Sequence, residues 1–335
     1  MMVAEAYTVL LAFTSPECVP EWFGNATRAA AQLAALPAEG DYTFWVVGDT
    51  QGSGTYEGFM DRVREERPDC VVFLGDVVGN PTEGDHTFFR SELWEMASPC
   101  PVLCVPGNHD IDPRTFPLSR FRDLYGPVPA ALAVGPDLFL LLPFFADNQE
   151  DGGRQAEEAA RFLEATLAGR RDSYRHVFLF CHNPGGIFPG CRQSDSPAYV
   201  RLAQLMGTYR LTACFAGHLH LYQEAEADGT RYFISGGGGS RLLKGTHDPR
   251  GFFHSLVIKV GAGAPEYSVL PLAEREDVGD KTKWWFLARV LPYVRQEPGG
   301  LIAGNALVAG MLVLTLCRPR VRPLGSGELQ EAGGD

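Results

Sequence analysis

The stretch YTFWVVGDTQ, residues 42–51, joins a run of apolar and aromatic side chains to a polar end. Such a short apolar run is typical of a buried strand. Four later stretches share the design: CVVFL before Gly75-Asp76, PVLCV before Gly107-Asn108-His109-Asp110, HVFLF before Cys181-His182-Asn183-Pro184, and LTACFA before Gly217-His218-Leu219-His220. Because ligands bind at the carboxyl ends of the strands in open α/β sheets, we expect these polar residues to meet along one edge.

Helical periodicity alternates with these strands. It predicts helices at residues 27–36, 55–67, 86–97, 154–167 and 198–206. Further strands are predicted at residues 138–144, 231–235, 253–260 and 267–270. The last three of these strands have no helix between them, so they indicate a second sheet or an antiparallel edge. Two stacked mixed sheets flanked by helices account for this order.

Composition excludes some classes of protein. A net charge of −12 argues against a nucleic-acid backbone as the main partner. Small phosphate esters stay open as substrates, because bound cations dominate the local field of a metal site. Four of the eight cysteines fall inside strand-like runs, and no CxxC or zinc-finger spacing occurs. Reduced thiols in a core are therefore favoured over a disulfide framework.

The polar ends carry the donors of a two-metal site. Asp76 follows a glycine at a strand end, where its carboxylate can bridge two cations. The remaining predicted ligands divide between the ions, with Asp49 and His220 on one and Asn108, His182 and His218 on the other. Two ions about 3.5–4 Å apart activate a bridging hydroxide as nucleophile and clamp a phosphoryl group. Mixed nitrogen and oxygen donors favour Mn, Fe or Zn over Mg or Ca.

Two further residues are candidates for the chemistry. His109 follows the predicted ligand Asn108, so we expect it to face the site without binding metal and to act as the general acid for an alkoxide leaving group. Arg241 follows the glycine run Gly236–Gly239 and is a candidate contact for a substrate phosphate. The glycine run is either a tight turn or a loop close to the metals.

The ordered set resembles the calcineurin-like metallophosphoesterase superfamily. Its pattern D-x-H, GD, GNH[DE], H and GHxH is met by Asp49, Asp76, Asn108-His109-Asp110, His182 and His218/His220, within residues 42–270. The resemblance implies a four-layer α/β/β/α sandwich and a dinuclear centre of divalent or trivalent ions. It also implies hydrolysis of a phosphomonoester or phosphodiester, which makes the protein an enzyme.

The sequence departs from the family pattern at two positions. Gln51 stands where the motif commonly has a histidine, which makes it a weaker metal ligand or a supporting residue. Gly79 stands where many members have an aspartate that supports the catalytic histidine, and Asp110 and Asp112 are the candidates to replace it. These departures leave open an alternative, a metal-binding module of the same fold with weak or lost catalysis.

The chain divides into five predicted regions. They are an N-terminal extension (1–40), the catalytic domain (41–275), a basic aromatic connecting segment (276–298), a hydrophobic helix (299–317) and a disordered tail (318–335). Residues 301–317 carry no charge and have tryptophans before them and arginines after them. This pattern predicts a transmembrane or membrane-inserted helix, and hence membrane association of an otherwise cytoplasmic protein. The alternative is a helix buried against the catalytic domain.

Overall fold

The strands of a computed structural model of the protein form two mixed sheets. The structure describes residues 23–25, 27–37, 40–146, 148–191, 195–242, 249–275, 278–296 and 299–300. One sheet contains β1 (Tyr42–Val47), β2 (Cys70–Phe73), β3 (Val102–Cys104), β10 (His254–Val260) and β11 (Glu266–Pro271), in the order β11-β10-β1-β2-β3. The other contains β4 (Ala130–Val134), β5 (Asp137–Leu141), β6 (Val177–Phe180), β7 (Ala213–Ala216), β8 (Tyr222–Ala227) and β9 (Thr230–Ser235), in the order β4-β5-β6-β7-β9-β8.

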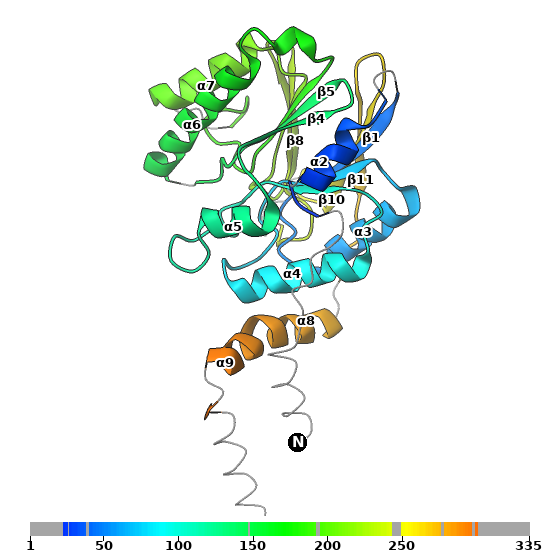
Figure 1. Cartoon of the computed structure of the whole chain (residues 1–335), viewed down its shortest axis with the longest axis vertical. Helices are drawn as coiled ribbons and strands as arrows, with labels where there is room; N and C mark the ends of the chain where they lie inside the picture. Colours follow the sequence, from blue (N-terminus) through cyan, green and yellow to red (C-terminus); the bar gives the residue numbers. More distant parts are fainter. Residues whose placement is uncertain are drawn as a thin grey trace, which may run out of the picture. The chain divides into compact units, whose positions relative to one another are not determined.

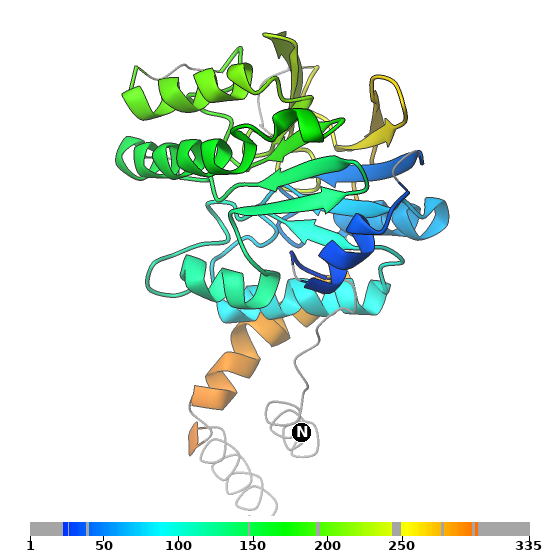
Figure 2. The same cartoon turned by 45° about the horizontal axis from the view of Figure 1, so that its top comes forward.

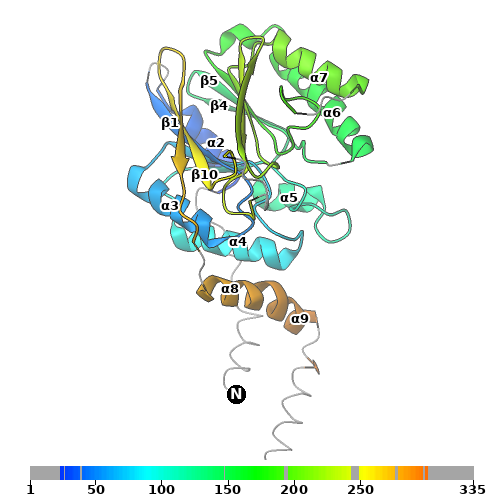
Figure 3. The ribbon, with the colours of Figure 1, turned by 180° about the vertical axis from the view of Figure 1, so that it is seen from behind.

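The elements between and after these strands are mostly helices, several of which flank the two sheets (Figure 1). The helices are α2 (Thr27–Ala34), α3 (Gly54–Glu66), α4 (Glu83–Met96), α5 (Leu118–Tyr125), α6 (Gln149–Leu167), α7 (Pro197–Thr208), α8 (Val278–Trp285) and α9 (Leu291–Gln296), with a 3-10 turn at Arg171–Ser173 and a π-helical turn at Phe286–Val290. Residues 16–290 form one compact unit, and α9 belongs to a second. The α6 and α7 helices lie together on one side of the six-stranded sheet, as Figure 2 and Figure 3 also show.

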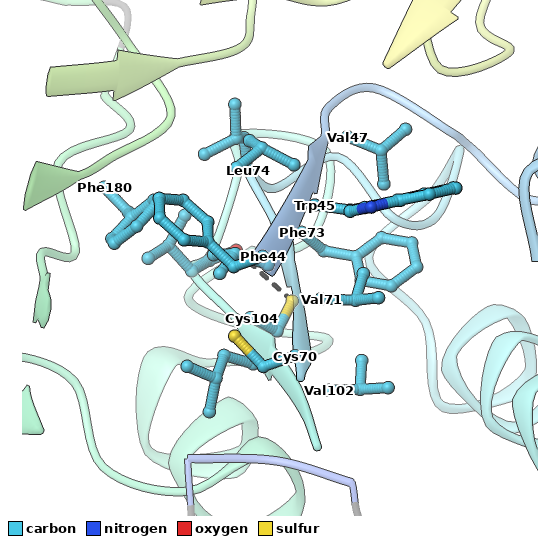
Figure 4. Packing of buried hydrophobic residues seen from close by; sticks show 14 of the residues in the cluster. Phe44, Trp45, Val47, Cys70, Val71, Phe73, Leu74, Val102, Cys104 and Phe180 are labelled. Atoms are coloured by element: carbon cyan, nitrogen blue, oxygen red, sulfur yellow. Dashed lines mark hydrogen bonds between the residues drawn. The ribbon is translucent and has the colours of Figure 1, made fainter. Parts of the chain in front are cut away.

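Alternation along β1 explains why the sheets stack. Phe44 points to the six-stranded sheet, where its ring meets Phe139 and Phe178 at centroid distances of 4.8 and 5.1 Å. Its neighbour Trp45 points the other way (Figure 4), and its ring centroid lies 5.9 Å from that of Phe59 of α3. Because successive side chains of a strand point to opposite faces, the unbroken apolar run from Phe44 to Val47 buries both faces of β1. The two-sheet α/β prediction is therefore confirmed.

The order of the last strands differs from the prediction. We expected residues 231–235 to group with the two strands that follow, but β9 lies in the six-stranded sheet, parallel to β7 and antiparallel to β8. Instead, β10 pairs antiparallel with β1 and carries β11 at the edge. The strands β4 and β8 and the helix α5 had no counterpart in the prediction.

Two helices and one strand begin or end at other residues than predicted, each for a physical reason. The helix α4 begins three residues before His86, because the side chain of Thr82 accepts a hydrogen bond from the backbone N–H of Asp85. Asn148 caps α6 in the same way, so that helix begins before Arg154. The strand β5 stops at Leu141 rather than at Phe144, because Pro143 has no N–H for the ladder.

The predicted membrane segment lies almost entirely outside the described residues, which end at residue 300. The tail at residues 318–335 lies outside them too. Among the helices that the structure does describe, none is both long enough and apolar enough to cross a membrane. The cysteines at positions 70, 100, 104, 181, 191 and 214 are all free thiols.

Candidate metal centre

Both sheets contribute to the predicted site. Asp49, Asp76 and Asn108 follow the parallel strands β1, β2 and β3 of the five-stranded sheet. His182 and His218 follow the parallel strands β6 and β7 of the six-stranded sheet, and His220 comes two residues later. The site therefore lies where the carboxyl ends of the two sheets meet.

The closest group of donors is formed by Asp49, Asp76 and His182. One ligand atom from each of these buried residues lies within 4.8 Å of the others. Nε2 of His182 is 3.4 Å from Oδ1 of Asp76. Two carboxylates and an imidazole at this separation are able to surround a metal ion.

The other predicted ligands lie beside this group. Oδ1 of Asn108 is 2.9 Å from Nε2 of His182 and 3.1 Å from Nδ1 of His218. Nε2 of His220 is 3.4 Å from Oδ1 of Asp49. The structure thus brings all six predicted ligands together, although its closest group combines Asp49 with His182, which the sequence assigned to different ions.

Backbone carbonyls orient two of the histidines. Nδ1 of His182 lies 2.8 Å from the carbonyl oxygen of Leu74, and Nδ1 of His220 lies 2.8 Å from that of Arg241. With Nδ1–H donating to a carbonyl, Nε2 of each ring keeps its lone pair for a metal ion. The sequence did not indicate these carbonyls, because backbone groups carry no residue-type signal.

The backbone around the carboxylates is strained and closely packed. Asp49, Asp76 and His218 have φ values of 59°, 51° and 67°, in the left-handed region that non-glycine residues rarely occupy. Such strain persists only where the surroundings fix the conformation, and it is common at functional sites. A Cβ on Gly107 would lie 2.1 Å from Oδ1 of Asp76, and one on Gly217 would lie 2.4 Å from Oδ2 of Asp49.

Burial makes the negative charge at the site costly. Burial raises the pKa of Asp76, and the nearby Asp49 raises it further, against the opposing effect of His182. Burial also raises the pKa of Asp110 to about 7, with a contribution from Asp76. Burial would lower the pKa of His182, but the carboxylates of Asp76 and Asp49 outweigh it and the pKa is raised. Cations between these donors would offset the repulsion, so the residues fit a metal site.

His109 lies next to the predicted ligands with its side chain exposed. Its backbone N–H donates to Oδ1 of Asp76 at 2.8 Å, and its Nδ1 is 3.2 Å from the carbonyl oxygen of Gly79. The two aspartates considered as partners are engaged elsewhere. The carboxylate of Asp110 accepts from the backbone N–H groups of Val78 and Gly107, and that of Asp112 accepts from those of Arg114 and Thr115.

The two weaker candidates have different surroundings. Gln51 donates its backbone N–H to the carbonyl oxygen of Asp76 at 2.9 Å. The residue lines a cavity shared with the start of α3 and with α8. Arg241 is exposed, and its carbonyl orients His220. The glycine loop before it passes close to the site, since a Cβ on Gly236 would lie 3.0 Å from Oδ2 of Asp49.

A fold of two mixed sheets whose strand ends gather carboxylates, imidazoles and an amide is typical of a metal-dependent hydrolase. Residues 42–222 match the model of the calcineurin-like phosphoesterase family, which is more than half of the chain. The chain belongs to this family, as the sequence predicted.

Two curated relatives match about half of the chain at low sequence identity. The chain is 26% identical to a probable cyclic nucleotide phosphodiesterase of Pseudoalteromonas sp., over 52% of this chain and 65% of the relative. It is 28% identical to the probable glycerophosphodiester phosphodiesterase GpdQ of Arcobacter nitrofigilis, over 46% of this chain and 57% of the relative. The matched part of the chain thus spans less than two thirds of each relative.

One solved structure supports the fold. It is GAP50, described as the anchor in the inner membrane complex of Plasmodium, with a TM-score of 0.51 and 13% sequence identity. The match covers 74% of this chain and 95% of GAP50. At this identity the similarity concerns the fold alone.

Proposed function

We propose that the protein hydrolyses phosphodiesters at a dinuclear metal centre. The observation that carries the proposal is the convergence of Asp49, Asp76 and His182, whose ligand atoms lie within 4.8 Å of one another. Both curated relatives have names that refer to phosphodiester substrates, a cyclic nucleotide and a glycerophosphodiester. These names support a diester over a monoester as the substrate of this chain.

The six donors would hold the two ions in two groups. Asp76 would bridge, with Asp49 and His220 on one ion and Asn108, His182 and His218 on the other. Mn, Fe or Zn suit this mixture of oxygen and nitrogen donors. When bound, two such ions supply activation of a water nucleophile and stabilisation of the charge that develops on the phosphoryl oxygens.

The chain itself supplies orientation and a proton. The carbonyls of Leu74 and Arg241 hold His182 and His220 with Nε2 toward the carboxylates. The Gly79 carbonyl would hold Nδ1–H of His109, which leaves Nε2–H to protonate the leaving alkoxide. Arg241 follows the loop next to Asp49, so its guanidinium is a candidate for a bidentate contact with the phosphate.

The proposal is tested by metal analysis together with a panel of esters. Purified protein loaded with Mn, Fe or Zn should bind two equivalents of metal and hydrolyse bis(4-nitrophenyl) phosphate faster than 4-nitrophenyl phosphate. Asp76→Ala and His218→Ala should abolish turnover. If no ester is turned over with any of these metals, the proposal is wrong.

A matched control lies at the opposite end of β6 from one predicted ligand. His176 precedes β6 and bonds to Gly263 and Thr212, whereas His182 follows the other end of the strand. We expect His182→Ala to lose metal and activity and His176→Ala to keep both. Two bound metal ions without turnover of any ester would instead favour the catalytically inactive module, for which the substitution at Gln51 is the supporting observation.

A further inference from the structure

A cavity of about 230 Å³ lies near the predicted metal centre. Its walls come from the turn at residues 51–55, from Gly239 and Phe253, and from Arg275, Lys281 and Trp284 near α8. Pockets that hold a whole small molecule usually measure about 300–1,000 Å³. A smaller cavity suits one substituent of a larger substrate.

Backbone hydrogen bonds connect the wall of this cavity to the main chain of two predicted metal ligands, Asp76 and Asp49. Gln51, in its wall, donates its backbone N–H to the carbonyl oxygen of Asp76 at 2.9 Å. Ser240, next to the wall residue Gly239, donates its backbone N–H to the carbonyl oxygen of Asp49 at 2.7 Å. The same two loops therefore hold the backbone of the two aspartates and shape the cavity.

The walls combine aromatic surface with polar groups. Phe253 and Trp284 offer aromatic rings, which stack on planar groups. The carboxamide of Gln51 offers both a donor and an acceptor to the edge of such a group. Arg275, Lys281 and Glu274 add charged groups to the wall, and Arg275 pairs with Asp61 at 3.1 Å. The start of α3 adds a partial positive charge, so the cavity favours an electron-rich planar ring.

The tryptophan wall is fixed on α4. Nε1 of Trp284 donates to Oδ1 of Asp85 at 2.9 Å. The adjacent Lys283 forms ion pairs with Glu92 and Glu95. Gly84 permits close packing, because a Cβ there would lie 2.6 Å from Cα of Ala288. These contacts fix the position of this side of the cavity in the folded protein.

We propose that this cavity holds the substituent that stays on phosphorus when a phosphodiester is hydrolysed, and that this substituent is a planar aromatic ring. The proposal rests on the proposed function. In that function the leaving group lies next to His109, which protonates it. The cavity wall includes no residue of the loop at 107–112. The cavity therefore suits the other substituent, with Trp284 as the residue that sets specificity.

Two diesters with one leaving group test this proposal. Bis(4-nitrophenyl) phosphate and methyl 4-nitrophenyl phosphate both release 4-nitrophenol, but the first retains an aromatic ring and the second a methyl group. We expect Trp284→Ala to lower kcat/KM for the aryl ester about tenfold, as the loss of one stacking contact does. The kcat/KM for the methyl ester should change by less than about twofold, because a methyl group makes no such contact. The ratio of the two values is independent of the folded fraction of a preparation.

Two further variants distinguish stacking on the Trp284 ring from other effects of the substitution. Trp284→Phe keeps an aromatic wall and removes the hydrogen bond to Asp85, so it should keep most of the preference for the aryl ester. Trp285→Ala is the matched control, since this neighbour is 56% exposed and does not line the cavity. An unchanged ratio in Trp284→Ala, or an equal loss of preference in Trp285→Ala, overturns the proposal. If the wild type hydrolyses neither ester with any metal, the proposed function fails, and this proposal fails with it.

Discussion

The carbonyl oxygen of Gly79 lies 3.2 Å from Nδ1 of His109. The family pattern often places an aspartate at this position, and its carboxylate would support the catalytic histidine. Here a neutral carbonyl takes the place of that charge. The carbonyl oxygen orients the ring without placing a formal charge beside Nδ1. The departure at Gly79 therefore alters the charge at the site more than its geometry.

Restoring the carboxylate should change the pH dependence of catalysis. A Cβ added to Gly79 has no atom within 4 Å, so Gly79→Asp fits. The new negative charge should keep His109 protonated to higher pH and move the basic limb of the kcat/KM profile up by about one pH unit. Gly79→Asn, of equal size and without charge, should leave the limb in place. Equal shifts in both variants would rule out the electrostatic explanation.

Gly107 should tolerate no side chain. A Cβ there would lie 2.1 Å from Oδ1 and 2.2 Å from N of Asp76, so Gly107→Ala must displace the predicted bridging carboxylate. We expect a loss of about 1–3 kcal/mol in the free energy of unfolding, together with loss of bound metal. Thermal unfolding and metal analysis measure the two effects.

The control for this change is Gly58→Ala, inside α3. A Cβ at Gly58 meets nothing within 4 Å, and alanine is favoured over glycine in a helix by about 0.5–1 kcal/mol. That variant should therefore be slightly more stable than the wild type and keep its metal. Retention of metal by Gly107→Ala would contradict the close packing described for Asp76.

The sequence predicted the positions of the candidate ligands because of a simple physical rule. Apolar runs buried on both faces end in polar residues, and parallel strands bring those ends to one edge. Asp49, Asp76 and His182 therefore converge although they are far apart in the chain. The carbonyls of Leu74, Gly79 and Arg241 could not be predicted in this way, because every residue has a carbonyl.

The strand and the strand pairing that the sequence did not predict were missed for a different reason. The strand β8 has the sequence YQEAEA and no fully buried residue, so its hydrophobic pattern is weak. The pairing of β10 with β1 joins residues about two hundred positions apart, Tyr42 with Val260 among them. Sequence proximity instead favoured grouping β10 with β9, and long-range packing decided the outcome.

Gln51 provides a test of how the metals are held. The residue lines the cavity near α3, and its hydrogen bond to Asp76 is made by its backbone N–H rather than by its side chain. We therefore expect Gln51→Ala to retain both metal equivalents, whereas His182→Ala loses metal. Metal content after dialysis, measured by mass spectrometry, distinguishes the two variants. Loss of one equivalent in Gln51→Ala would identify the carboxamide as a ligand after all.

His86 should make stability depend on pH. This buried ring bonds to the hydroxyl of Tyr125 and the carbonyl oxygen of Asp110, and burial lowers its pKa from 6.5 to about 3. As the pH falls below 6.5, the unfolded chain takes up a proton that the folded protein excludes, so the stability present above pH 6.5 is lost toward pH 3.

The size of this loss of stability follows from the shift in the pKa of His86. Between pH 6.5 and 5, the difference amounts to about 2 kcal/mol of unfolding free energy, at about 1.4 kcal/mol per pH unit. Urea unfolding with a chelator present, which removes proton-linked metal binding, should show this slope in the wild type. His86→Gln cannot take up the proton in either state, so its stability should change less over the same range. Parallel pH profiles for the two proteins would mean that His86 titrates alike when folded and unfolded.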